Sequence, residues 1–319
     1  MARYDPQELK LSSVRGDSPY NYRYRSADAE LGVSVNRSGV LMPLIVTEEK
    51  HPVVIAGHKR FAAALAAGIE TVPALVAAGL KPQDAFLLNL ISNWRQEVPE
   101  MDRAKALGLA VRQFRFKPEE VREILMPLLG LPADQATLEL YLKADAMPGA
   151  LKDLFATGVL AFRGVTFLLK FSEADQTYFA KAVGSRVKLS SSQLLQTGEW
   201  LSDVMKREGK CLEALLKNHP VREVLDHPDI DPRTKADKFF AAVKWLRFPR
   251  YSAYLEAFEH RKADIIRDDK QWRLEPVEGF EEKGFELRAR VKNAADLDAI
   301  LKRLSESRSA LNSLFDVML

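Results

Sequence analysis

The feature that most constrains the fold of this chain is a buried-strand pattern followed by a glycine and then by a helix with basic residues in its first turn. The β-branched run Val53–Ile55 stops at Gly57, and an alanine-rich helix pattern begins at His58. Lys59 and Arg60 therefore fall in the first helical turn, where backbone N–H groups lack helical partners and the helix dipole is positive. Exposed amides and two cations together predict an anion site, most naturally for phosphate. The alternative is a plain strand-to-helix turn with solvated cations, although structural helices prefer acidic residues at this end.

Turn and strand signals on both sides of this junction predict a small mixed α/β domain. Residues 39–47 form a loop and a short buried strand, and residues 68–76 end the helix and begin another strand. This order resembles the N-terminal domain of the ParB family, which carries a Gly-x-x-x-Pro loop, a Gly-Glu-Arg-Arg-type box and an Ala-Gly-x-x-x-Val-Pro segment. The corresponding stretches here are Gly39–Pro43, Gly57–Arg60 and Ala67–Pro73.

In that family the box binds the triphosphate of CTP, so the resemblance implies a nucleotide site with the Gly39–Pro43 loop near the base or ribose. His58 stands in place of the usual Glu of the box, and Lys59 in place of its first Arg. A histidine in a first helical turn more commonly hydrogen-bonds to backbone or solvent than to phosphate. Both roles stay open for His58.

The resemblance also implies a magnesium ion, which the family holds with a Glu-Asn pair after the phosphate domain. Asn93 matches that Asn and is the expected metal ligand, whereas Ser92 replaces the acid. A serine hydroxyl can act as a neutral ligand but not as a carboxylate base. We therefore expect CTP and Mg²⁺ to bind with weak or absent hydrolysis, and Arg95 to be either a phosphate contact or a solvated charge. The expected nucleotide-binding residues are Gly39, Pro43, Gly57, His58, Lys59, Arg60, Ser92, Asn93 and Arg95.

Composition fits an ordinary globular protein and limits its class of function. Of the 319 residues, 47% are hydrophobic and 29% charged, and the net charge is +3. Because the charges nearly balance, any contact with nucleic acid must come from a local patch. Cys211 is the single cysteine, which excludes an internal disulfide and a multi-cysteine zinc site and fits a reducing compartment. No apolar run reaches membrane-spanning length and Met1–Asp17 has no signal-peptide core, so we expect a cytoplasmic protein without membrane contact.

Changes in hydrophobic period divide the chain into three predicted domains of an α+β protein. Residues 1–98 mix short strands and helices, residues 99–210 are helical, and residues 211–319 are helical before ending in a β-hairpin plus helix. This ending resembles the ParB dimerisation domain and implies a homodimer; alternatively, it closes the preceding helical domain on itself. Residues 20–25 alternate Tyr and Arg, and form either a loop that contacts a base or phosphate or an edge strand.

The middle segment resembles the helix-turn-helix region of the ParB family. We expect a first helix at residues 119–125, a turn at 128–132 lengthened by residues 126–127, and a recognition helix at 134–146. The side chains available as DNA contacts are those of Gln135, Thr137 and Lys143. Asp134 and Glu139 stand beside them and would repel phosphate.

As a whole, the resemblance implies a CTP-gated dimeric clamp on DNA that acts in plasmid or chromosome partition or in transcriptional regulation. One alternative is a nucleotide-gated module that binds a protein partner and no longer recognises DNA, which the acidic recognition helix favours. A second alternative is a small-molecule kinase on the same fold, which would need a catalytic carboxylate facing the phosphate. No motif places such a carboxylate in this chain.

Overall fold

The computed structural model describes residues 3–25, 28–93, 97–217, 221–266, 272–277 and 284–316. The chain divides into two compact units, Met1–Leu195 and Gln196–Leu319. The α+β class is confirmed, including the strand pair and helix near the C-terminus. The three-domain division, with boundaries near residues 98 and 210, stays a prediction. Among the described helices, none combines the length and apolarity needed to cross a bilayer.

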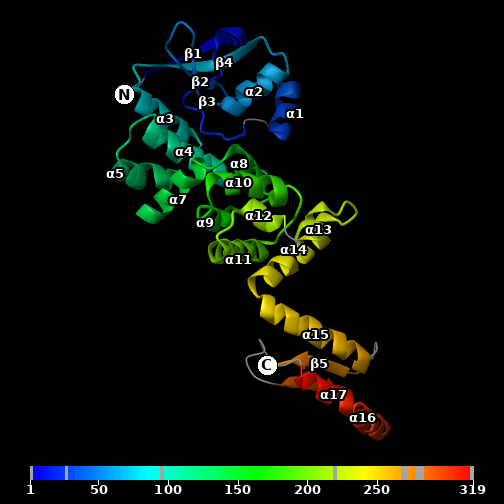
Figure 1. Cartoon of the computed structure of the whole chain (residues 1–319). Helices are drawn as coiled ribbons and strands as arrows, with labels where there is room; N and C mark the ends of the chain where they lie inside the picture. Colours follow the sequence, from blue (N-terminus) through cyan, green and yellow to red (C-terminus); the bar gives the residue numbers. More distant parts are fainter. Residues whose placement is uncertain are drawn as a thin grey trace. The chain divides into compact units, whose positions relative to one another are not determined.

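A four-stranded sheet forms the N-terminal part of the first unit (Figure 1). Its strands are β1 (Arg3–Lys10), β2 (Leu44–Thr47), β3 (Val54–Ala56) and β4 (Thr71–Ala78), in the spatial order β1-β4-β2-β3. Strand β4 pairs antiparallel with β1 and parallel with β2, with Leu44 opposite Ala74, and β2 pairs antiparallel with β3. The short strands β2 and β3 are thus the predicted ones on either side of the turn at residues 48–52.

The core beside this sheet fixes the position of the helix that follows β3. Two helices pack there, α1 (Ala29–Ser38) and α2 (His58–Ala66). Leu44, Val46 and Val54 are fully buried and share one apolar cluster with Ala64 of α2. Burying each large aliphatic side chain contributes roughly 1.5–3 kcal/mol. The first turn of α2 is therefore held where the packed strand β3 ends.

The rest of the first unit is helical. Its remaining helices are η1 (Leu11–Ser13), α3 (Pro82–Ser92), α4 (Glu100–Arg112), α5 (Pro118–Glu120), the π-helical η2 (Val121–Leu125), α6 (Met126–Leu128), α7 (Gln135–Asp145), α8 (Gly149–Ala156), η3 (Phe162–Gly164), α9 (Val165–Leu168), α10 (Glu173–Phe179) and the π-helical η4 (Ala180–Gly184). Helix α11 (Ser191–Glu208) spans the division between the units. Residues 20–25 form a loop rather than an edge strand.

The expected first helix of the helix-turn-helix region is longer than its pattern indicated. Residues 118–128 are helical without a break, so Met126 and Pro127 belong to the helix and the expectation that they lengthen the turn was wrong. Met126 is fully buried, which favours continued helix. The π-helical η2 ends at Leu125, two residues before Pro127, in the turn that a proline ring would crowd. The recognition helix α7 begins as expected, with Asp134 as its N-cap.

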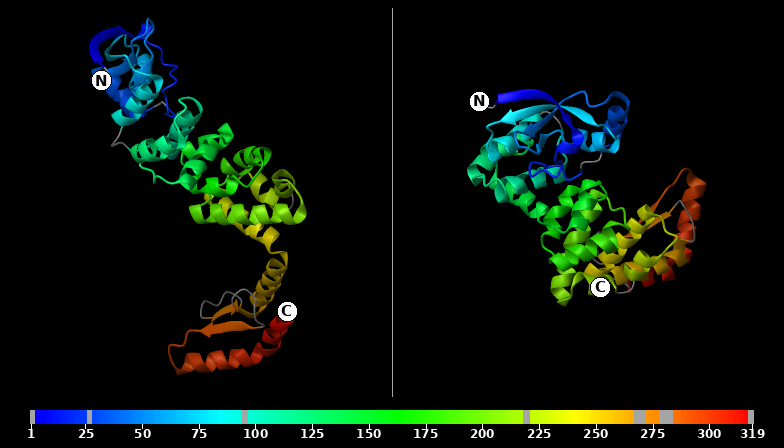
Figure 2. Two further views of the ribbon diagram at one scale, coloured as in Figure 1. Left: turned by 90° about the vertical axis from the view of Figure 1, so that its left-hand side faces the viewer. Right: turned by 90° about the horizontal axis from the view of Figure 1, so that it is seen from above.

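The second unit ends in the strand pair and helix that the sequence predicts. Its elements after α11 are α12 (Leu212–Leu216), α13 (Val221–Asp226), α14 (Pro232–Arg247), α15 (Pro249–Ile266), β5 (Trp272–Pro276), β6 (Phe285–Ala289), α16 (Ala294–Glu306) and α17 (Arg308–Phe315). Strands β5 and β6 are antiparallel, and Figure 2 shows them beside α15 and α17. Phe258, Leu274 and Leu314 form the buried core of this end. Leu297 and Leu301 on α16 are 45% and 56% exposed.

Candidate functional site

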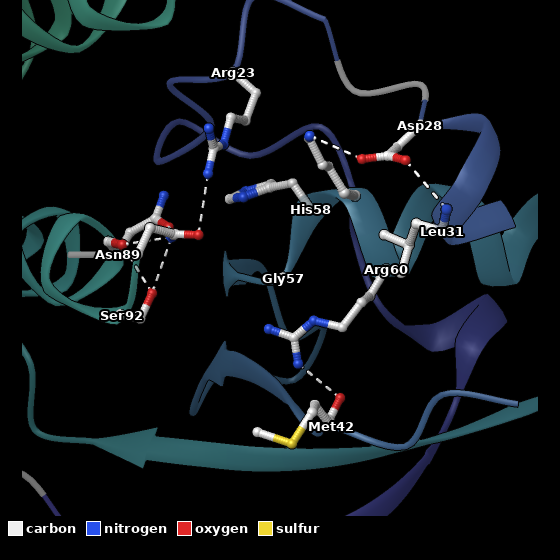
Figure 3. A pocket seen from close by; sticks show the side chains of 11 residues that line it. Arg23, Asp28, Leu31, Met42, Gly57, His58, Arg60, Asn89 and Ser92 are labelled. Carbon is white, nitrogen blue, oxygen red and sulfur yellow. Dashed lines mark hydrogen bonds and ion pairs between the residues drawn. The ribbon is translucent and has the colours of Figure 1, made fainter. Parts of the chain in front are cut away.

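The first turn of α2 opens onto a cavity of about 400 Å³ (Figure 3). Its walls come from the loop before α1, the loop before β2, the start of α2 and the end of α3. The lining residues are Arg23, Asp28, Leu31, Met42, Gly57, His58, Lys59, Arg60, Asn89, Ser92 and Asn93. Six of the residues expected from the sequence are therefore brought together here, although they come from segments that lie about 30 residues apart.

Three further expected residues are not among the lining residues: two do not line the cavity, and the third lies outside the described part of the chain. Gly39 and Pro43 are not among the lining residues, whereas Met42, which lies between them in the sequence, is. Gly39 is the C-cap of α1, with a φ of 71° that favours glycine. Arg95 lies outside the described residues.

Gly57 allows the cavity to approach the backbone at the start of α2. Its φ is 99°, and an added Cβ would lie 2.8 Å from the Leu44 side chain and 3.1 Å from Arg60 Nη2. Both the backbone conformation and the space therefore require glycine. No side chain caps this end of α2, so the amides of its first turn keep their capacity to bind an anion.

Arg60 ties the loop before β2 to the cavity. Its Nη1 donates to the carbonyl oxygen of Met42 at 2.7 Å and to that of Pro43 at 2.6 Å. Burial lowers the pKa of the guanidinium from its usual value, but arginine stays charged near neutral pH. One side chain thus supplies positive charge and also positions the Gly39–Pro43 loop at the cavity.

Lys59 pairs with the single carboxylate among the lining residues. Its Nζ lies 3.0 Å from Asp28 Oδ2, while Asp28 Oδ1 caps α1 by accepting from the Leu31 N–H at 3.1 Å. The Leu31 hydrogen bond, followed by that of Lys59, lowers the pKa of Asp28. Because Asp28 is ionised and committed to two partners, it is a poor general base.

Arg23 is one of five lining residues that were not expected individually from the sequence; the others are Asp28, Leu31, Met42 and Asn89. The side chain is 8% exposed; Nη1 lies 3.0 Å from Asp102 Oδ2 of α4, and Nη2 lies 3.1 Å from Asn93 Oδ1 at the end of α3. The backbone N–H of Tyr24 donates to Asp102 Oδ1 at 2.8 Å. The Tyr-Arg alternation signalled a candidate segment, but the sequence did not reveal which arginine turns inward.

Asn93 and Ser92 are held by hydrogen bonds within the end of α3. Asn93 Nδ2 donates to the Asn89 carbonyl at 2.8 Å, and the Ser92 hydroxyl donates to that same oxygen at 2.8 Å. Asn89 in turn donates through its side chain to the Tyr20 carbonyl at 2.8 Å. These contacts orient the Asn93 carbonyl oxygen toward a guanidinium.

The lining residues do not fit a protein-held magnesium ion. Mg²⁺ prefers carboxylate oxygens and retains water, yet the Asn93 oxygen faces the Arg23 guanidinium and Asp28 is paired with Lys59. Within the described parts of the chain, no group of three or more His, Cys, Asp or Glu side chains is placed to hold a metal. The expectation that Asn93 is a metal ligand therefore finds no support in the geometry.

His58 is buried at the cavity wall with one unsatisfied nitrogen. The side chain is 6% exposed, and Nε2 has no hydrogen-bond partner within the described structure. In Figure 3 its ring extends toward the side of the cavity formed by Arg23 and Asn89. Burial is the main cause that lowers the pKa of His58 to about 4, so the imidazole is neutral at pH 7.

The three residues expected to contact DNA lie on or beside α7, away from this cavity. Gln135 Nε2 donates to Glu139 Oε1 at 2.9 Å, and the Thr137 hydroxyl donates to Asp134 Oδ2 at 2.8 Å. Both donors are therefore committed to carboxylates of the same helix end. Lys143 is exposed and provides a cation on this helix.

Comparison with known proteins gives one match over most of the chain and others over parts of it. Residues 6–94 match the ParB N-terminal domain. The chain is 27% identical over 312 residues to stage 0 sporulation protein J of Bacillus subtilis (strain 168), covering 95% of this chain and 92% of that protein. It is 29% identical over 166 residues to the chromosome-partitioning protein ParB of Myxococcus xanthus, covering 51% and 54%.

Among solved structures, the C-terminally truncated ParB from Caulobacter crescentus complexed to the centromeric parS site is similar over 60% of this chain and 98% of that chain. The identity is 18% and the TM-score 0.37. The same truncated protein complexed with CTP-gamma-S is 20% identical, with a TM-score of 0.26, over 56% of this chain and 97% of that chain. The sequence match at residues 6–94 contains every residue of the cavity lining, and related sequence continues from it into the C-terminal unit. Residues 6–94 therefore form a ParB N-terminal domain, and the similarity to stage 0 sporulation protein J extends over 95% of the chain.

Proposed function

We propose that this chain is a partition protein that binds CTP in the cavity at the start of α2 and associates with DNA as a dimer. The observation that carries the proposal is the charge of that cavity. Arg23, Lys59 and Arg60 line it beside the uncapped amides of α2, and two carboxylates, Asp102 and Asp28, pair with Arg23 and Lys59. Such an arrangement suits a polyphosphate. Relatives named as chromosome-partitioning proteins, and a solved ParB complexed with CTP-gamma-S, support the choice of partition and of CTP.

Each cationic side chain would have a separate task toward the nucleotide. The α2 amides and Arg60 bind phosphate oxygens, and Lys59 exchanges part of its contact with Asp28 for one with phosphate. Because Arg60 holds the carbonyls of Met42 and Pro43, the loop that begins at Gly39 lies beside the bound nucleoside. Magnesium, when present, would neutralise phosphate charge. It would be bound by the phosphates of the nucleotide and not by the protein, because the lining residues offer it no free carboxylate.

Hydrolysis by this site would be slow or absent. Attack by water on a phosphoanhydride benefits from a base that accepts a proton, and the lining carboxylate Asp28 is already paired with Lys59. The Ser92 hydroxyl donates to a backbone carbonyl and has no acidic function. The same argument disfavours a small-molecule kinase, which needs a carboxylate directed at its substrate hydroxyl.

A second function, a nucleotide-gated module that binds a protein partner, is favoured by α7. The donors of Gln135 and Thr137 are occupied by Glu139 and Asp134, two carboxylates that would repel phosphate. Retention on DNA at increasing salt separates the two functions, because binding through phosphate contacts weakens steeply as salt rises. Retention that is absent at low salt as well would favour the protein-partner module.

Calorimetric titration with CTP and ATP tests the nucleotide site directly. Arg60→Ala removes charge-assisted hydrogen bonds worth about 1.5–3 kcal/mol each, which corresponds to a loss of affinity of roughly 10- to 150-fold. Arg37→Ala is the matched control, since Arg37 is exposed in the last turn of α1 and is not among the lining residues. Equal losses in both variants, or no binding by the unmodified chain, would rule out the proposed site.

A further inference from the structure

His58 presents an electron pair to a cavity that otherwise offers hydrogen-bond donors and positive charge. The imidazole hydrogen-bonds to the backbone of Val54, and Nε2 is the nitrogen that has no partner within the described structure. Nδ1 therefore carries the proton and donates to the Val54 carbonyl. In the neutral ring, the buried Nε2 is then an acceptor. A buried polar atom without a hydrogen-bond partner costs free energy of the order of 1–3 kcal/mol. A ligand that forms a hydrogen bond with Nε2 would remove this cost.

The charges that face His58 explain why the empty cavity keeps the ring neutral. Desolvation by burial lowers its pKa most, and Lys105 of α4, Arg23 of the loop before α1 and Arg60 of α2 lower it further. The carboxylates nearby are already paired, Asp102 with Arg23 and Asp28 with Lys59. Helix α3 contributes only the uncharged side chains of Asn89, Ser92 and Asn93 to the cavity lining.

A bound polyanion would reverse this balance. Its oxygens would be repelled by the Nε2 electron pair, whereas a protonated ring would donate to them, and the negative charge would offset the cations that disfavour protonation. We propose that His58 makes the cavity a proton-linked anion site, in which the imidazole takes up one proton from solvent as a polyphosphate binds and Nε2 then donates to a phosphate oxygen. This inference rests on the proposed polyphosphate site and adds that the site responds to pH. Among the lining side chains, His58 is the one whose ordinary pKa lies between 5.5 and 8, so it is the side chain that a bound polyanion can bring to titrate in that range.

Linkage fixes the size and direction of the effect. Between the pKa of His58 in the empty protein and its higher value in the complex, each unit of decrease in pH strengthens binding by up to about tenfold. The protein then takes up one proton for each polyphosphate bound. If the ring stays neutral in the complex, affinity is independent of this residue's protonation.

The test is calorimetric titration of the full chain with CTP and, separately, with inorganic tripolyphosphate, from pH 5.5 to 8.0. Each titration is made in two buffers of different ionisation enthalpy, so that the difference counts protons. His58→Gln keeps a polar side chain that cannot titrate, and we expect it to lose the proton uptake and the pH dependence. His51→Gln is the control, because His51 is exposed and outside the cavity lining. Protons taken up or released by the phosphate groups of the ligand contribute equally in each variant, so they cancel when the proton uptake of the variants is compared.

A spectroscopic measurement on the unmodified chain keeps the inference testable if His58→Gln does not fold. Long-range ¹⁵N spectra of histidine-labelled protein distinguish a neutral ring protonated at Nδ1 from a charged ring. We expect His58 to be neutral without ligand and charged in saturating tripolyphosphate at pH 6.5. The signals of the chain's five histidines are assigned with single variants.

The outcomes separate this inference from the proposed function. Binding of CTP without proton uptake, or uptake that persists in His58→Gln, overturns the proton link and leaves the nucleotide site intact. Proton-linked binding of tripolyphosphate with no binding of CTP supports the link and overturns the choice of nucleotide. Failure of both ligands to bind overturns both claims.

Discussion

The buried ion pair between Arg23 and Asp102 predicts a large and specific loss of stability when the arginine is replaced. The two charged groups are 3.0 Å apart, and their side chains are 8% and 7% exposed. Arg23→Met keeps much of the apolar stem but leaves the Asp102 carboxylate buried without its cation. Removing one partner of a buried pair costs about 3–5 kcal/mol, because the other charge stays desolvated.

This cost can be converted into a melting temperature for the first unit, Met1–Leu195. For a unit of this size each kcal/mol lowers the midpoint by roughly 2–4 °C, so we expect a decrease of about 6–20 °C. Arg15→Met is the matched control in the same unit. Arg15 and its partner Asp17 are 52% and 79% exposed, and such a surface pair contributes at most about 1 kcal/mol.

The assay is urea and thermal unfolding of the full chain, followed by circular dichroism. A double variant, Arg23→Met with Asp102→Leu, tests the cause of the loss. Replacing both charges by apolar side chains is close to neutral for a buried pair, so the double variant should recover most of the lost stability. A loss in Arg23→Met no larger than that in Arg15→Met would refute the reasoning, as would a double variant no more stable than Arg23→Met.

Three other predictions concern the cavity and α7. Gly57→Ala should lower the free energy of unfolding in urea more than Gly68→Ala does. The backbone φ is positive at both residues, but of the two only Gly57 has other atoms within 4 Å of an added Cβ, and equal losses of stability would contradict this prediction. The free energy of unfolding should fall as the pH decreases from 6.5 toward 4, because His58 is protonated in the unfolded chain but stays neutral in the folded chain, where its pKa is about 4. His58→Gln should reduce this fall, and a pH profile unchanged by the substitution would contradict the prediction. Glu139→Gln should strengthen retention on DNA at low salt by removing one repelling charge, and weaker retention would argue against α7 facing phosphate.

The strand–glycine–helix junction was predictable because its signals are local. β-branched residues before Gly57 and alanines after Arg60 specify backbone periods, and a positive φ at that junction requires glycine. The limits of α7 agree with those that the resemblance implied, and Asp134 caps its start. The continuation of the helix through Pro127 was not predictable. The sequence shows only the helix-breaking proline, whereas the burial of Met126 that outweighed it is visible only in the structure.

The sequence by itself therefore determined the fold class and the presence of Ser92 in place of an acid, and it predicted an anion site at the first turn of α2. Only the tertiary structure decided how the charges of that site are paired. Arg23 reaches Asp102 and Asn93 from 79 and 70 residues away, and Arg60 binds carbonyls of a loop 17 and 18 residues away. Periodicity carries no information about such pairs, because they depend on which side chains the packed core brings together. The protonation state of His58 has the same origin, since desolvation and neighbouring charges exist only once the chain is folded.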